Sequence, residues 1–108
     1  MSSGSFGEMG NLLKQAQEMT RQLDRAREEL RTTIVTGTSA GGQVTVDATG
    51  EGLIVRISIK PEIVAPGAGP RIEELVLAAA RDAITKSQAL REERMSRVTG
   101  GLNLPGLF

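Results

Sequence analysis

The stretch TTIVTGTSAGGQVTVDATGEGLIVRISIKP, residues 32–61, decides the fold. It holds three runs rich in Val, Ile and Thr, residues 32–38, 43–49 and 53–60, and short glycine-containing segments separate them. Alternation of β-branched and polar residues is typical of strands with one buried and one solvated face. Connections this short join antiparallel neighbours. The stretch therefore predicts a three-stranded antiparallel meander with one apolar face.

The alternation also assigns side chains to the two faces of the predicted sheet. In the second run, Val44, Val46 and Ala48 share the apolar face. In the third run, strict alternation predicts one face made of Leu53, Val55, Ile57 and Ile59, and an opposite face made of Ile54, Arg56, Ser58 and Lys60. The apolar face needs a cover, which the flanking segments must supply.

The segment before the sheet predicts a helix over residues 9–31, after a loose N-terminus at residues 1–8. A helix of this length is about 32 Å long, whereas three strands are only about 10 Å across and about 23 Å long, so the helix must overhang the sheet. Its apolar residues recur every three or four positions, which favours packing against another helix. That helix is the C-terminal one, a copy from a second chain, or both. The seam comprises Leu12, Ala16, Met19, Leu23, Ala26 and Leu30.

After the sheet, prolines and glycines predict an irregular connector over residues 61–69. A second helix is predicted over residues 70–98, and its small residues Ala79 and Ala83 would let it lie close to the sheet. Gly100 and Gly101 are expected to stop it, and a Leu-rich tail at residues 99–108 is expected to dock in an apolar groove. The expected fold class is α+β, a single α-β-β-β-α domain spanning residues 1–108.

Composition excludes most enzyme chemistry. The chain has no cysteine and no histidine, so thiol catalysis, disulfides and the commonest general base are absent. The glycine-rich segments read as hairpin turns, because no Lys-Ser or Lys-Thr follows them. We predict no catalytic residue, no metal, no cofactor and no small-molecule substrate. There is no secretory signal and no apolar run of about 20 residues, which predicts a cytoplasmic protein without a membrane partner.

With most enzyme chemistry excluded, binding is the remaining class of function, and the charged residues indicate where it could occur. Thirteen Lys and Arg balance thirteen Asp and Glu, so contacts with nucleic acid would have to come from local patches of cations. Such patches occur on both helices, although a solvated surface is the other interpretation of the same charges. The candidate DNA-binding residues are Lys14, Arg21 and Arg25 on the first helix and Lys86, Arg91, Arg94 and Arg97 on the second.

Four segments, taken in order along nearly the whole chain, resemble one known family. They are NLLKQAQEM at residues 11–19, VTGTSAGGQVTV at 35–46, EELVLAAARDA at 73–83 and RMSRVTGGLNLPG at 94–106. Together they are similar to the YbaB/EbfC family of nucleoid-associated proteins.

The resemblance implies an α-β-β-β-α fold, a homodimer shaped like tweezers, and a bacterial, cytoplasmic, nucleoid-associated protein that binds double-stranded DNA through its helices. It implies neither catalysis nor a cofactor. Lys14 and Arg94 lie at matching positions of the family motifs, whereas the other candidate cations are chosen by surface charge alone. Few base contacts are expected, hence low sequence selectivity and a role in nucleoid organisation and gene regulation. The alternative is a protein-interaction module, in which the seam and the Leu-rich tail dock a partner protein.

Overall fold

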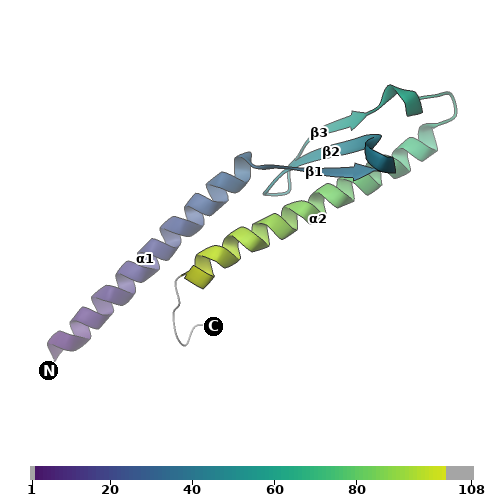
Figure 1. Cartoon of the computed structure of the whole chain (residues 1–108). Coiled ribbons are helices and arrows are strands. Elements are labelled where there is room, and N and C mark those ends of the chain that lie inside the picture. The colour runs from purple at the N-terminus through teal and green to yellow at the C-terminus, as the bar shows by residue number, and fades with distance from the viewer. Residues whose placement is uncertain (1, 102–108) are drawn as a thin grey trace.

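The computed structural model describes residues 2–101, which form two long helices and one small sheet (Figure 1). The sheet contains three strands in the order β1-β2-β3, and both pairs of neighbours are antiparallel. The predicted α-β-β-β-α order is confirmed. The elements are α1 (Ser2–Thr32), β1 (Ile34–Ser39), a 3-10 turn η1 (Ala40–Gly42), β2 (Val44–Thr49), β3 (Ile54–Ile59), a second 3-10 turn η2 (Pro61–Ile63) and α2 (Gly69–Gly101).

The molecule is strongly extended. α2 runs along one face of the sheet, whereas α1 leaves the end of the sheet and continues past the C-terminal end of α2 (Figure 1). The principal extents are 82 × 22 × 16 Å and the radius of gyration is 21.6 Å. A compact domain of about 100 residues has a radius of gyration of about 13 Å. The predicted overhang of the helices is therefore confirmed.

The core lies between β2 and the first half of α2. Val44, Val46 and Ala48 are fully buried, as their alternation predicted, and they pack on Ala79 and Ala83 of α2. These two residues are one helical turn apart, so they present a small, flat face to the strands. The core is consequently thin: its fully buried residues from α2 are alanines, and the larger Leu75 and Val76 of α2 pack at its margin and are only partly buried.

Gly37 of β1 sets how closely the sheet approaches α2. A Cβ atom built on Gly37 would lie 2.2 Å from the carbonyl oxygen of Ala79 and 2.3 Å from the backbone nitrogen of Ala83. Only a residue without a side chain can bring the backbone of a strand this near to the backbone of a helix. The predicted close approach of the alanine face is confirmed, and its partner is this glycine.

β3 departs from the predicted alternation. Ile59 and Ile57 pair with Val44 and Val46, but the register shifts between Asp47 and Ala48, and Ala48 pairs with Ile54. The shift is a β-bulge, so Ile54 and not Val55 shares the face of Ala48. The predicted grouping of Leu53 and Val55 with Ile57 is therefore wrong.

Large apolar residues in and beside β3 are also exposed, contrary to the expectation that flanking helices cover its apolar face. Leu53, Ile54, Val55 and Ile57 are each between 41% and 65% exposed. α2 packs mainly on β1 and β2, and α1 extends away from the sheet after its last turn, so β3 has little cover from either helix (Figure 1).

Several predicted boundaries shift. α1 starts at Ser2, so the predicted loose segment at residues 1–8 is helical from there. α1 also extends to Thr32, because the hydroxyls of Thr32 and Thr33 donate to the Glu29 carbonyl and continue the last turn. α2 runs to Gly101, through the glycines expected to end it. The predicted docking of the tail concerns residues 102–108, which lie outside the described residues.

We predict that Gly37→Ala destabilises the fold by at least about 2 kcal/mol, because overpacking against backbone atoms cannot be relieved by a rotamer change. Urea unfolding followed by circular dichroism would measure the loss. Gly10→Ala is the matched control, since an added Cβ there meets nothing within 4 Å and alanine favours a helix. Equal stability of Gly37→Ala and wild type would contradict the close-approach model.

Candidate nucleic-acid interface

The two helices meet beyond the sheet and form one arm, which we define as α1 together with α2 from Ser87 onward. Ala26 and Leu30 of α1 are buried where the helices converge, and Met19 and Leu23 are half-buried. Leu12 and Ala16 are exposed, because α1 continues beyond α2 (Figure 1). The C-terminal part of the predicted seam thus packs within the chain, and its N-terminal part has no cover from the described residues.

The base of the arm is fixed by the turn between β2 and β3. The Gly50 N–H donates to the carbonyl oxygens of Leu30 and Thr33, at 2.9 Å in each case. A Cβ atom on Gly50 would lie 2.6 Å from Leu30 Cδ2. Because Gly50 has no side chain, the last turn of α1 rests directly on the sheet and takes its direction from it.

α2 is attached to the same turn by two polar contacts. The hydroxyl of Ser87, which is fully buried, donates to the Thr49 carbonyl at 2.9 Å. The guanidinium of Arg91 donates to the Gly50 carbonyl at 3.3 Å. Both helices of the arm therefore hydrogen-bond within two consecutive residues of the sheet, which fixes the angle between them.

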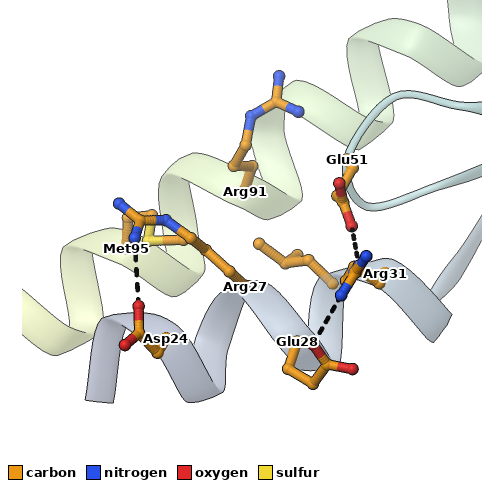
Figure 2. Close-up of a pocket in the computed structure, with 8 residues that line it drawn as sticks. Asp24, Arg27, Glu28, Arg31, Glu51, Arg91 and Met95 are labelled. Carbon is orange, nitrogen blue, oxygen red and sulfur yellow. Dashed lines mark hydrogen bonds and ion pairs between the residues drawn. The ribbon is translucent and has the colours of Figure 1, made fainter. Parts of the chain in front are cut away.

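A cavity of about 590 Å³ lies at this junction (Figure 2). Its wall is formed mainly by ion pairs, since Arg31 contacts Glu28 at 3.0 Å and Glu51 at 3.2 Å. Hydrogen bonding to Glu28, together with the charges of Glu28 and Glu51, raises the pKa of Arg31 above its ordinary value. Arg27 pairs with Asp24 at 3.5 Å. The charges of the cavity are thus largely balanced by their neighbours.

Sequence reasoning missed Arg27 and Arg31, which the structure places beside the predicted Arg91 around this cavity. They are four residues apart on α1 and so share one helical face. That spacing was visible in the sequence. The pairing of Arg31 with Glu51, which comes from the turn after β2, could not be seen without the fold.

Three of the predicted cations come together from the two helices of the arm. Arg25 of α1 and Arg94 and Arg97 of α2 line one shallow depression. Arg94 lies 3.7 Å from Glu29, and Arg97 pairs with Glu93 on its own helix. Among the ion pairs of the described residues, none involves Arg25. We call Arg25, Arg94 and Arg97 the arm cluster.

Lys14 and Arg21 lie further out on α1 and line a second depression together. Both are exposed, and Arg21 pairs with Glu18 at 3.0 Å. At 100° per residue, Lys14, Arg21 and Arg25 fall within about 40° of one another around the helix axis. The cations of α1 therefore form a single stripe that leads to the arm cluster.

Lys86 does not lie with these cations but at the edge of the sheet. Its ammonium donates to the Thr36 carbonyl at 2.9 Å and pairs with Asp82 at 3.1 Å, at the outer edge of β1. Asp82 also accepts a hydrogen bond from the Thr38 N–H at 2.9 Å. That backbone hydrogen bond, followed by the one from Lys86, lowers the pKa of Asp82 below its ordinary value. Lys86, like Arg91, therefore donates to a backbone carbonyl and has a structural partner in the fold.

Other kinds of site are not formed by the described residues. Over residues 2–101, no three Asp or Glu side chains gather in a way that could hold a metal ion. Neither α1 nor α2, over the same range, is apolar enough along its length to cross a bilayer. The site is instead a stripe of cations, interleaved with carboxylates, on a long exposed arm.

These features define an extended α-β-β-β-α protein whose helical arm carries a stripe of cations. Comparison with known proteins agrees, since residues 6–102 match the model of the YbaB/EbfC DNA-binding family. The chain belongs to the YbaB/EbfC DNA-binding family.

Relatives extend this match over the full length. A nucleoid-associated protein of Acetivibrio thermocellus is 42% identical, and the alignment covers 100% of both chains. One of Chloroflexus aurantiacus is 45% identical over 90% of this chain and 95% of the relative. The fold resembles the crystal structure of uncharacterized protein HP0035 from Helicobacter pylori, with a TM-score of 0.64 and 24% identity over 91% of this chain and 97% of the other.

We predict that Ser87→Ala costs about 1 kcal/mol of stability, because it removes a buried hydrogen bond to the Thr49 carbonyl, which keeps its bond from the Gly52 N–H. Urea unfolding would measure the change. Ser96→Ala is a suitable control, since Ser96 is exposed on the same helix and alanine is a better helix former. An equally small effect of both substitutions would show that the Ser87 contact does not fix the base of the arm.

Proposed function

We propose that this protein binds double-stranded DNA as a homodimer in the nucleoid, with low sequence selectivity. The observation that carries the proposal is the match to a DNA-binding family over residues 6–102. The names of the full-length relatives, which are nucleoid-associated proteins, support the location. A role in nucleoid organisation and gene regulation would follow from such binding.

The arm supplies the chemistry that a DNA backbone requires. DNA affinity comes mainly from Lys and Arg placed opposite phosphates, and these contacts carry little sequence information. We assign the phosphate contacts to Lys14 and Arg21 and to the arm cluster, residues Arg25, Arg94 and Arg97. Lys14 and Arg25 are eleven residues apart, or roughly 17 Å along the helix, which is more than the width of the major groove, about 12 Å, so the two cations can reach phosphates on both of its sides.

The carboxylates beside these cations do not prevent binding. The pairs Arg21–Glu18 and Arg97–Glu93 lie at the surface, where ion pairs contribute little to stability. An arginine can therefore turn from its carboxylate to a phosphate at small cost. Arg91 donates to the Gly50 carbonyl at the base of the arm, and Lys86 donates to the Thr36 carbonyl at the edge of β1. We therefore propose that these two residues have structural roles and do not contact DNA directly.

Two observations support the homodimer. The chain buries few apolar side chains for its size, and it is much longer than a compact domain. Large apolar residues also remain exposed on β3. Small domains that cannot complete a core alone are often completed by a second copy.

We predict that mobility-shift titrations with an arbitrary duplex show binding whose affinity falls steeply as salt rises, because phosphate contacts release counterions. Lys14→Gln and Arg25→Gln should each weaken binding and reduce the slope of log K against log salt by about 1. The absence of any shift at low salt would contradict DNA binding.

Arg71→Gln is the control for charge. Arg71 is exposed at the first turn of α2, at the end of the sheet opposite the arm (Figure 1). The substitution removes the same charge as Lys14→Gln and Arg25→Gln, but at a site away from the arm. It should therefore leave the slope of log K against log salt unchanged. An equal loss in all three variants would indicate that net charge, and not the arm, controls binding.

The second candidate function is a protein-interaction module, favoured by the exposed apolar residues Met9, Leu12 and Leu13 near the outer end of α1. In this case a protein partner would be retained after nuclease treatment and lost on Leu12→Gln, which removes the apolar side chain without changing the charge. Unchanged DNA affinity of Leu12→Gln would separate the two functions, because Leu12 lies outside the arm cluster.

A further inference from the structure

Two backbone groups at the outer edge of β1 are bonded to side chains of α2. The Thr38 N–H donates to the Asp82 carboxylate at 2.9 Å, and the Thr36 carbonyl accepts from the Lys86 ammonium at 2.9 Å. Asp82 and Lys86 also pair with each other at 3.1 Å. Backbone groups alternate along an edge strand, so those of Thr36 and Thr38 point out of the sheet while those of Gly37 face β2. The ion pair therefore occupies groups that a further strand would need.

The ion pair supplies the same bonding groups as a residue of a neighbouring strand. A carboxylate accepts a hydrogen bond as a backbone carbonyl does, and an ammonium donates one as an N–H does. In a parallel strand pair, one residue bonds to the two residues that flank its neighbour, and Asp82 and Lys86 take these positions on either side of Gly37. In an antiparallel pair, a residue uses both of its outward groups, and Thr36 and Thr38 each have one already bonded. Either kind of strand addition would have to displace the ion pair.

The close contact between α2 and β1 brings the ion pair to this edge. α2 runs beside β1 (Figure 1), with Ala83 against the backbone of Gly37. Asp82 and Lys86 are four residues apart and so share the helical face next to that contact. The hydrogen bond from the Thr38 N–H holds the pKa of Asp82 below its ordinary value, so the side chain stays a charged acceptor.

An occupied β1 edge matters because the strand at the other edge of the sheet is apolar and exposed. Leu53, Ile54, Val55 and Ile57, in and beside β3, are each between 41% and 65% exposed. Strands of this kind tend to pair with other chains. A sheet can grow without limit only if both of its edges accept strands, since association through one edge ends when two such edges have met. Closing one edge is therefore enough to prevent open-ended growth.

We propose that Asp82 and Lys86 cap the β1 edge and thereby keep copies of this chain from joining into open-ended sheets. The cap sets an upper limit on association, whatever the number of chains in the normal assembly. Copies bound side by side on a duplex would be at high local concentration, where an uncapped edge would join them. This last consequence rests on the function proposed above, whereas the cap itself does not.

The double variant Asp82→Ala/Lys86→Ala removes the cap without changing the net charge, and alanine favours the helix. Amide hydrogen exchange should become faster at Thr38, because its N–H loses its acceptor. Light scattering should give a wild-type mass that is constant as the protein concentration rises. The mass of the double variant should rise with concentration to several-fold above wild type. Should the double variant not fold, Lys86→Ala alone gives the same comparison through the freed Thr36 carbonyl.

Ser39→Ala is the matched control for a contact between β1 and α2. The Ser39 hydroxyl donates to the Leu75 carbonyl at 2.7 Å, so the substitution also removes a hydrogen bond between these two elements. The backbone groups of Ser39 face β2, however, and the outer edge keeps its cap. This variant should therefore keep the wild-type mass at every concentration.

A rescue variant separates capping from a purely structural role of the ion pair. Thr38 is exposed near the middle of the β1 edge, and a lysine on an edge strand discourages pairing with another chain. Adding Thr38→Lys to the double variant should return the mass to that of the wild type. If the ion pair only held α2 in place, the added lysine would not restore the mass.

Three results would overturn the proposal. Faster exchange at Thr38 with an unchanged mass would show that the edge is open and still accepts no strand. Unchanged exchange at Thr38 would show that the ion pair does not cover the edge. A raised mass in Ser39→Ala, or a failure of Thr38→Lys to lower the mass, would assign the association to a loosened α2. These measurements need no DNA, so they decide on the cap independently of the proposed function.

Discussion

The architecture depends on contact between backbone and backbone, at Gly37 of β1 against Ala79 and Ala83 of α2. A helix that carries alanines towards the sheet cannot build a thick core, so stability has to come from close packing of few atoms. The result is a thin sheet-on-helix layer with large apolar residues left outside, on β3. The small buried surface and the exposure of β3 thus both follow from the small residues at the contact between β1 and α2.

Small residues also set the contacts at the base of the arm. Gly50 lets the last turn of α1 rest on the turn between β2 and β3, and Ser87 joins α2 to the preceding residue. Cations are then distributed along a rigid pair of helices and balanced locally by Glu18, Glu29 and Glu93. A protein with zero net charge can bind a polyanion in this way, because weak surface pairs open where the phosphates lie.

Much of the fold could be predicted from the sequence, because the signals were local. Alternation in β2 and the small face of α2 follow from the order of residues alone. The bulge at Val55 could not be predicted, since it depends on how β3 pairs with β2. For the site, the position of each cation on a helix was predictable. The engagement of Lys86 with Thr36, fifty residues away, and of Arg31 with Glu51 required the tertiary structure.

Because α1 is attached to the rest of the fold at Gly50, a small rotation there moves the far end of the helix by a larger distance. Its 31 residues extend roughly 46 Å from that pivot, so a rotation of about 5° at the base displaces the far end by about 4 Å. A displacement of that size exceeds the tolerance of a hydrogen bond. Substitutions at Gly50 would thus change the direction of the outer part of α1 without altering a single charge.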